Sequence, residues 1–180
     1  MKKLSKKEKT RIKIMHAAKG LFESYGLDGV TFNQVAEAAD VCRTTVFNHF
    51  ASTSELMLAI SAQEIEDVKD YCDEKNLSGV DRIKALYGKL IEDLAYYPNL
   101  TTRLIYNAVL NGDEENPVKE IEDMTYDSLK SAGIENADNM TLMIIGAYYG
   151  LTNHYHINNL KFDAAKMKEQ FYDLLASIIK

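Results

Sequence analysis

Regularly spaced apolar residues, with few helix-breaking residues between them, constrain the fold of this chain more than any other feature. Only two prolines and nine glycines occur in 180 residues. Apolar residues recur three or four positions apart over long stretches, as in Ile14, Ala18, Leu21 and Tyr25. Because proline and glycine are the residues that most disfavour helix interiors, this pattern predicts a mostly helical chain. No segment has the pattern of a credible β-strand.

Capping boxes mark the first turns of three predicted helices. Each box places a hydroxyl three residues before Glu or Gln, so that the two side chains satisfy backbone N–H groups reciprocally. The motifs are Ser5-Lys6-Lys7-Glu8, Thr31-Phe32-Asn33-Gln34 and Ser52-Thr53-Ser54-Glu55. The first opens a helix over about residues 6–25, which Gly26 ends. The third opens a long helix that runs toward Tyr71 or Cys72.

Five further helices are predicted in the rest of the chain, over about residues 79–97, 99–111, 117–132, 138–158 and 163–179. Pro98 ends the first of them, and Asn111-Gly112 ends the second. Asn116 caps the third, and Pro117 occupies its first position, where the missing N–H costs nothing. We interpret Asp113-Glu114-Glu115 as a solvated loop.

Residues 31–50 have the spacing of a helix-turn-helix. Val35, Ala36 and Ala39 form a short apolar face, and residues 40–42 then break the period. Val46 and Phe50, four positions apart, resume it. Two helices of about eight residues joined by a three-residue turn are typical of this motif.

The second helix of the motif has the character of a DNA-recognition helix. Val46 and Phe50 can anchor it while polar residues project outward, and arginine and asparagine pair well with guanine and adenine edges. Thr31 begins the preceding helix, where hydroxyl and backbone N–H groups can hold a phosphate. We expect DNA contacts from Thr31, Arg43, Thr44, Thr45, Phe47, Asn48, His49 and Thr53.

The charge distribution agrees with DNA contact at one end of the chain. Residues 1–54 carry nine Lys or Arg and five Asp or Glu, a net charge of +4, although the whole chain carries −6. A basic segment followed by an acidic remainder favours contact with phosphate at one end only. A lysine-rich N-terminal tail that only aids solubility is the alternative.

The segments AAKGLFESYGLDGV (residues 17–30) and TFNQVAEAADVCRTTVFNHFAS (residues 31–52) resemble the signature of the TetR (tetracycline repressor) family of transcription regulators. The resemblance covers about residues 10–58. It implies an all-α fold of about nine helices and dimerisation through the last two. It further implies a three-helix DNA-binding head at residues 1–52 and a helical ligand-binding and dimerisation body at residues 53–180.

Four positions depart from that family pattern. Asp40 replaces a glycine in the turn, which it can do because aspartate tolerates left-handed geometry, but it adds a negative charge near DNA. Cys42 replaces a serine cap, and a thiol is a weaker acceptor than a hydroxyl. Thr53 replaces a frequent lysine, and Phe47 lacks the usual tyrosine hydroxyl, so each loses a phosphate contact. None of the changes removes a group that reads bases.

The last two predicted helices suggest a subunit contact. Gly146 and Gly150 lie four apart and predict a tight helix contact, inside or between subunits. The apolar stripe of the last helix is wider than the face that a lone surface helix buries, so both of its sides should be covered. A four-helix contact with a symmetry mate would cover it, and burial inside the subunit is the alternative. The expected interface comprises Gly146, Gly150, Phe171, Leu174, Leu175 and Ile178.

Eleven tyrosines and seven methionines suggest an adaptable binding site for a small apolar or aromatic effector. We expect it to be lined by Leu86, Leu90, Tyr106, Tyr126 and Tyr148, with plain core packing as the alternative. His154 and His156 face different directions on a helix, so we interpret them as surface or interface residues rather than a metal pair.

Other function classes lack their sequence signals. No phosphate loop, nucleophile elbow or metal-ligand spacing occurs, so we expect no enzyme, metal or cofactor. Cys42 and Cys72 are too few for a disulfide framework. The longest apolar run, Met140–Leu151, is shorter than the roughly 20 residues of a membrane span. With no signal-peptide pattern at the N-terminus, these features predict a cytoplasmic protein without membrane contact.

Together these features predict a homodimeric TetR-like repressor that binds a palindromic operator in double-stranded DNA and is released by a small effector. Two alternatives remain open. One is a DNA-binding protein regulated by a protein partner, and the other is an all-helical small-molecule binder that does not bind DNA.

Overall fold

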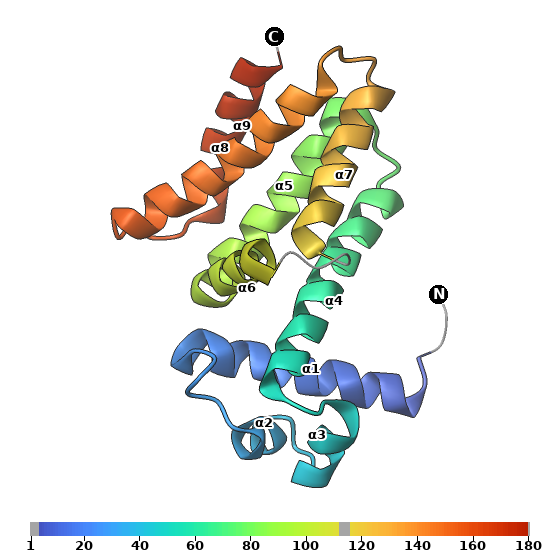
Figure 1. Ribbon diagram of the computed structural model, residues 1–180, viewed down its shortest axis with the longest axis vertical. Helices are drawn as coiled ribbons and strands as arrows, with labels where there is room; N and C mark the ends of the chain where they lie inside the picture. The colour runs from blue at the N-terminus through green and yellow to red at the C-terminus, as the bar shows by residue number, and fades with distance from the viewer. Residues whose placement is uncertain (1–3, 112–115, 180) are drawn as a thin grey trace. The chain divides into compact units, whose positions relative to one another are not determined.

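The computed structural model describes residues 4–111 and 116–179, and this part of the chain folds into nine α-helices with no strand (Figure 1). The all-α prediction is confirmed, and most predicted bounds agree within one residue. The proposed Asp113–Glu115 loop, Lys2 and Lys3 lie outside the described residues. The helices are α1 (Lys6–Tyr25), α2 (Phe32–Ala38), α3 (Arg43–His49), α4 (Thr53–Glu74), α5 (Gly79–Tyr96), α6 (Pro98–Asn111), α7 (Pro117–Ser131), α8 (Ala137–Ile157) and α9 (Ala164–Ile178).

Two of the predicted capping boxes form completely. Ser5 Oγ accepts a hydrogen bond from the N–H of Glu8, and Glu8 Oε2 accepts one from the N–H of Ser5. Thr31 and Gln34 make the same pair of contacts at α2. At α4, Ser52 Oγ accepts from the N–H of Glu55 at 3.0 Å, but Glu55 Oε2 accepts from the N–H of Ala51 at 2.6 Å, one residue earlier than predicted.

Helix α4 belongs to two compact units, which divide the chain between Gln63 and Glu64. We call the described residues up to Gln63 the head and those from Glu64 the body. Leu56 and Ile60 of α4 are buried in the head, whereas Val68 and Cys72 belong to the core of the body. The predicted boundary at residues 52/53 falls at the start of this same helix.

The body has a core built around aromatic side chains. Helix α5 packs against α6, α7 and α9, while α8 packs against α7 and α9 (Figure 1). The ring of Tyr87 stacks on Phe171 with centroids 4.7 Å apart and meets the ring of Tyr148 edge-on at 5.5 Å. All three side chains are at most 4% exposed, so they hold α5, α8 and α9 together.

This packing corrects the interface expected on α9. Phe171 and Leu175 are 0% and 1% exposed in the single chain, so they fill the core of their own subunit and offer no surface to a partner. Leu174 is 42% exposed, and Ile178 is half-buried. The wide stripe on α9 is therefore covered largely from within, because α5 and α8 both pack on it.

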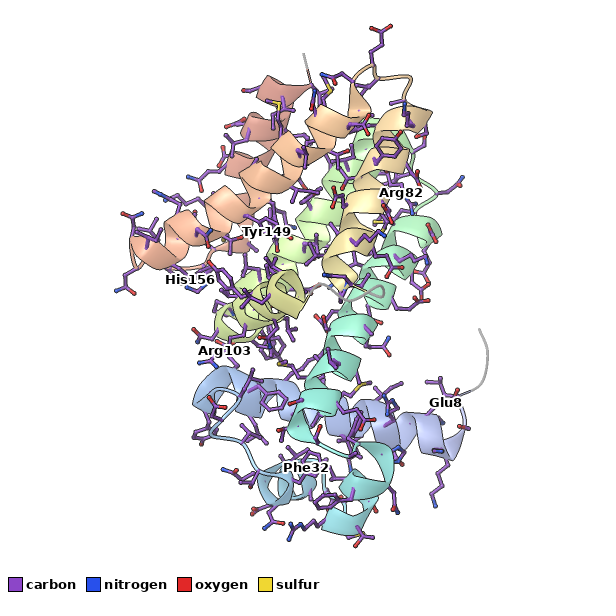
Figure 2. All side chains as sticks on the ribbon, in the orientation of Figure 1. Glu8, Phe32, Arg82, Arg103, Tyr149 and His156 are labelled. Atoms are coloured by element: carbon purple, nitrogen blue, oxygen red, sulfur yellow. The ribbon has the colours of Figure 1, made fainter. Side chains whose placement is uncertain are left out.

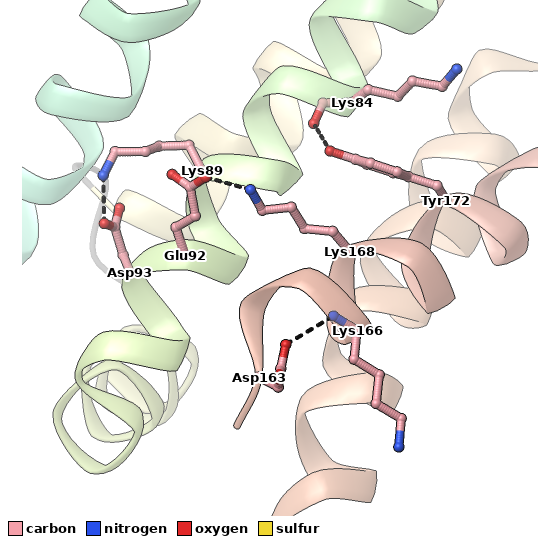
Figure 3. A network of polar contacts seen from close by, with 8 residues as sticks. All are labelled: Lys84, Lys89, Glu92, Asp93, Asp163, Lys166, Lys168 and Tyr172. Carbon is pink, nitrogen blue, oxygen red and sulfur yellow. Dashed lines mark hydrogen bonds and ion pairs between the residues drawn. The ribbon is translucent and has the colours of Figure 1, made fainter. Parts of the chain in front are cut away.

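The close helix approach inside the body occurs at Gly88 and not at the two predicted glycines. A Cβ atom on Gly88 would lie 2.6 Å from Tyr172 Oη, which donates a hydrogen bond to the main-chain oxygen of Lys84. An ion pair between Lys168 and Glu92 closes the same α5–α9 contact (Figure 3). Gly146 and Gly150 are exposed, with no atom within 4 Å of an added Cβ.

Two further features concern the described ranges alone. No helix within residues 4–111 and 116–179 is long and apolar enough to span a membrane. In the same ranges, no three His, Cys, Asp or Glu side chains gather as metal ligands would.

Candidate nucleic-acid interface

The turn between α2 and α3 is a Schellman motif with aspartate in the position that favours glycine. Asp40 has a φ of 47°, and its N–H donates to the main-chain oxygen of Glu37. The N–H of Val41 donates to the main-chain oxygen of Ala36, which completes the motif. Asp40 thus adopts the left-handed geometry that the sequence predicted. Lys13 Nζ lies 3.5 Å from Asp40 Oδ2 and partly offsets the added negative charge.

Recognition helix α3 is anchored by the two residues that the sequence predicted. Val46 and Phe50 are 0% and 1% exposed. Arg43, Thr44 and Asn48 are exposed on the outer face, together with Phe47. Thr45, His49 and Thr53 are half-buried. A short helix held by buried anchors, with polar groups directed outward, is able to present side chains to the major groove.

Phe47 supports Arg43 from the same helix. The guanidinium of Arg43 lies over the Phe47 ring, 5.1 Å from its centroid, and Phe32 of α2 (labelled in Figure 2) meets that ring edge-on at 4.9 Å. Phe47 has no hydroxyl for a phosphate, but it carries a cation–π contact that restricts the arginine. The sequence alone gives no signal for this supporting role.

Helix α1 holds the other end of α3 through Arg11. Arg11 Nη1 donates to the main-chain oxygen of His49 at 2.9 Å, and the guanidinium lies 4.3 Å from the centroid of the Phe50 ring. Burial, and then the positive charges of Lys7 and Arg11, lowers the pKa of His49. The imidazole at the C-terminal end of α3 therefore favours its neutral form.

Cys42 occupies the N-cap position of α3 without capping it by its side chain. Its Sγ instead lies 3.0 Å from Thr45 Oγ1, so the thiol accepts no hydrogen bond from a backbone N–H of the first turn. That contact lowers the pKa of the Cys42 thiol. The hydroxyl of Thr31 is likewise engaged within the chain, since it donates to Gln34 Oε1 at 2.8 Å.

The residues expected to line an effector site fall into two groups. Leu86, Leu90 and Tyr148 lie in the core of the body, at most 8% exposed. Tyr106 is 50% exposed on α6 and donates to Asn153 Oδ1, and Tyr126 is half-buried with Lys130 over its ring. The five therefore do not form one interior surface, because Tyr106 faces outward.

Polar side chains that carry no local sequence signal accompany this core. Tyr87 Oη and Thr125 Oγ1 form a buried hydrogen bond of 3.0 Å between α5 and α7. On α8, His156 Nε2 lies 2.6 Å from Thr102 Oγ1, whereas His154 contacts Asn158. The sequence offered no signal for the Tyr87–Thr125 pair, since its members are 38 residues apart.

The head is thus a helix-turn-helix DNA-binding domain with its recognition helix exposed. Residues 14–60 match the family model for the N-terminal domain of "Bacterial regulatory proteins, tetR family". The match identifies residues 14–60 as an N-terminal DNA-binding domain of the TetR family of transcription regulators.

Two curated relatives support the assignment. The chain is 27% identical to the "HTH-type transcriptional repressor AcnR" of Corynebacterium efficiens over 106 residues, which cover 59% of this chain and 53% of that protein. It is 24% identical over 186 residues to the "Probable acrEF/envCD operon repressor" of Escherichia coli K12, with 92% of this chain and 84% of that protein covered. The chain spans about half the length of AcnR.

Solved structures share the fold of the whole chain. A TetR/AcrR-type transcriptional regulator of Aquifex aeolicus has a TM-score of 0.74 at 18% identity, with 94% of this chain and 99% of that one covered. The fatty acid degradation regulator FadR of Bacillus halodurans has a TM-score of 0.75 at 18% identity and 97% coverage of both chains. FadR of Bacillus subtilis, solved with stearoyl-CoA, has a TM-score of 0.65 at 16% identity and covers 94% of this chain and 97% of its own.

Proposed function

We propose that this chain represses transcription by binding a palindromic operator as a homodimer. The observation that carries the proposal is the outer face of α3, where Arg43, Thr44 and Asn48 project from a helix anchored by Val46 and Phe50. Two-fold symmetry would place two recognition helices about 34–36 Å apart, one turn of DNA, or a multiple of that distance. The relatives AcnR and the acrEF/envCD regulator are named as repressors.

The test is selection of a DNA site by the full-length protein, followed by gel shifts with Arg43→Ala. Loss of one good base contact is expected to cost about 1–3 kcal/mol and to relax the preference at one base position. Arg103→Ala, an exposed arginine of the body, is the matched control and should leave sequence preference unchanged. If DNA binding does not weaken as salt is added, or if no DNA site is selected, the result would favour the alternative of an all-helical small-molecule-binding protein that does not bind DNA.

The proposed dimer contact is the outward apolar face of α8 and α9. Leu142, Met143 and Ile157 are 62%, 55% and 82% exposed, and Leu174 lies on the neighbouring helix at 42%. Gly146 and Gly150 lie between them without side chains, which would let a second copy approach closely. Large apolar side chains exposed on two neighbouring helices are candidates for a subunit contact.

We further propose that a small apolar or aromatic effector binds in the body and lowers DNA affinity, in the cytoplasm where the operator is found. Helix α4 belongs to both units, so a ligand that favours a different direction of α4 could change the spacing of two recognition helices. FadR of Bacillus subtilis, which shares this fold, is a precedent with its stearoyl-CoA ligand.

Calorimetry with one bound compound, with and without operator DNA, tests this regulation. A tenfold loss of DNA affinity corresponds to about 1.4 kcal/mol of coupling, and the DNA must weaken ligand binding by the same factor. Equal ligand affinity in the two titrations would leave regulation by a protein partner as the alternative.

A further inference from the structure

An aromatic ring is exposed in the middle of the polar outer face of α3. Phe47 is 46% exposed, although it lies four residues after Arg43 and directly before Asn48, which are both exposed polar residues. It has no hydroxyl that could form a hydrogen bond with a phosphate. When α3 enters the major groove, base edges cover this ring, so burial is favourable where the DNA offers an apolar group.

The position of this ring is fixed from α2. The ring of Phe32, which is 8% exposed and is labelled in Figure 2, meets the ring of Phe47 with centroids 4.9 Å apart and an interplanar angle of 72°. Edge-to-face contacts between aromatic rings have a preferred geometry, so Phe32 restricts the direction of the Phe47 ring. Phe32 is the first residue of α2 and belongs to the core of the head, so it is itself held in place.

The Phe47 ring in turn restricts the guanidinium of Arg43. Cζ of Arg43 lies 5.1 Å from the centroid of the ring, within the range of a cation–π contact. Side chains four residues apart lie on one face of a helix, so the two groups are presented on the same side of α3. No carboxylate of the described residues pairs with Arg43, so its N–H groups remain available to a base. An arginine that is already restricted loses less side-chain entropy when it binds.

The chemistry of the major groove gives each of the two groups a matching partner. Guanine presents the two acceptors N7 and O6, which match the paired donors of an arginine, and thymine presents a C5 methyl group, which can contact a phenylalanine ring. Successive bases of one strand are stacked about 3.4 Å apart. The separation of 5.1 Å between the guanidinium and the ring is longer than one such step and shorter than two, which favours contact with neighbouring base pairs.

We propose that Arg43 and Phe47 read a guanine and an adjacent thymine as one unit. Phe47 contacts the thymine methyl group and positions Arg43 on the guanine. This assignment rests on the proposed operator binding and names two neighbouring base pairs of the operator. Phe47 is therefore a specificity-determining residue of α3, whereas a phenylalanine that only joined α3 to α2 would affect the binding of every DNA sequence alike.

Changes in the DNA test the proposal with the unmodified full-length protein. Each half-site selected from random sequences should contain a G·C pair beside an A·T pair. In one half-site, that thymine is replaced with deoxyuridine, which lacks only the methyl group, or that guanine with 7-deazaguanine, which lacks the N7 acceptor. The first change should weaken binding about fourfold, as expected for one buried methyl group, and the second about tenfold. Equal affinity for thymine and deoxyuridine, or a selected site without these two base pairs, overturns the proposal.

Substitutions of Phe47 show whether the ring carries both preferences. Phe47→Ala should abolish the preference for thymine over deoxyuridine and reduce the preference for guanine over 7-deazaguanine to about threefold, because Arg43 loses its cation–π contact. Phe47→Tyr keeps the ring and should retain both preferences. Tyr25→Ala, at a tyrosine of α1 that is 63% exposed, is the matched control and should also retain both. Each preference is a ratio of two affinities of the same protein, so partial unfolding of a variant does not change it.

Two results with the variants would give Phe47 another role and overturn the proposal. If Phe47→Ala weakens binding but leaves both ratios unchanged, the ring only packs α3 against α2. If Thr44→Ser, which removes a methyl group, abolishes the preference for thymine and Phe47→Ala does not, the contact belongs to Thr44.

Failure of the repressor proposal can be distinguished from failure of this assignment. If no site is selected, or if salt does not weaken DNA binding, both proposals fail. A selected palindrome whose binding does not depend on the thymine methyl group leaves the repressor proposal standing and overturns this assignment alone.

Discussion

Arg11 of α1 donates a hydrogen bond to the main-chain oxygen of His49, the last residue of the recognition helix, at 2.9 Å. The same guanidinium lies over the ring of Phe50, which is 1% exposed. A basic residue that would otherwise be assigned to phosphate contact thus fixes the C-terminal end of α3 from a helix that is 38 residues away in sequence.

Arg11→Ala should loosen α3 without changing which bases it reads. Loss of the hydrogen bond and the cation–π contact is expected to lower the free energy of unfolding by about 1–2 kcal/mol. DNA affinity should fall by a similar factor for all sequences, as chemical denaturation and gel shifts on selected and random sites would show. Lys9→Ala, an exposed lysine of the same helix, controls for loss of charge alone. A loss confined to the selected site would mean that Arg11 reads a base.

Substitutions at Asp40 separate backbone geometry from charge. Asp40→Asn keeps a residue that tolerates a positive φ, so stability should hardly change, whereas removing the negative charge should strengthen DNA binding by roughly 0.5–1 kcal/mol at low salt. Asp40→Gly should give the same gain and also stabilise the head by about 1 kcal/mol, since glycine adopts this geometry freely. Denaturation and DNA titration at two salt concentrations check both. Unchanged DNA affinity in Asp40→Asn would show that the carboxylate is remote from phosphate.

The two cysteines should differ in the pH at which they react. The contact with Thr45 lowers the pKa of Cys42, whereas burial raises the pKa of Cys72. Because the thiolate is the reactive form, a lowered pKa makes Cys42 reactive at lower pH than an ordinary cysteine, and Cys72 should react only at higher pH. Iodoacetamide labelling across a pH series, measured by mass spectrometry, tests this order.

Thr45→Val should move the onset of Cys42 labelling to higher pH, and Thr44→Val should not. Bound operator DNA should protect Cys42, which is exposed at the start of α3. Labelling of Cys72 at the same pH as Cys42, or an onset that Thr45→Val does not move, would contradict the assignment.

The helices could be predicted from the sequence because caps and periodicity act within one or two turns. Ser5 and Glu8 meet across three residues, and Val46 and Phe50 anchor α3 from positions four apart. Contacts between distant segments carry no such local signal. The sequence therefore did not reveal the contact between Arg11 and His49.

Glycine spacing shows the same limit. Gly146 and Gly150 have the spacing of a close helix contact, yet an added Cβ meets no atom at either position. Gly88 has no such spacing, but Tyr172, 84 residues later, lies against it. Likewise, the apolar stripe of α9 correctly predicted that Phe171 is buried. Only the packing of α5 and α8 on α9 shows that Phe171 is buried within its own subunit.

Gly88→Ala should therefore destabilise the body. Its Cβ would lie 2.6 Å from Tyr172 Oη, so the tyrosine must move and lose its hydrogen bond to Lys84. Overpacking of this kind costs about 1–3 kcal/mol, measurable by chemical denaturation. Gly20→Ala in α1, where nothing lies within 4 Å of an added Cβ, should instead stabilise its helix by roughly 0.5–1 kcal/mol. Equal effects of the two substitutions would argue against the close contact.

Charged substitutions on the outward face of α8 and α9 should give a folded monomer. Leu142 and Leu174 are 62% and 42% exposed in the single chain, so Leu142→Asp with Leu174→Asp should leave the subunit intact while burying unpaired charges in the proposed dimer contact. Phe171→Asp should instead unfold the body, because that side chain is fully buried in its own subunit.

Light scattering reports the oligomeric state and circular dichroism reports the helical content, so together they distinguish these outcomes. The control is Leu110→Asp on α6, which should remain dimeric because Leu110 is 79% exposed and lies outside the proposed contact. The monomer should also lose most of its affinity for a full palindrome, because it contacts one half-site at a time, while its affinity for an isolated half-site should match that of the unmodified protein. A double variant that remains dimeric would place the subunit contact on another face. A dimer of Phe171→Asp with native helicity would show that α9 is not held by its own core.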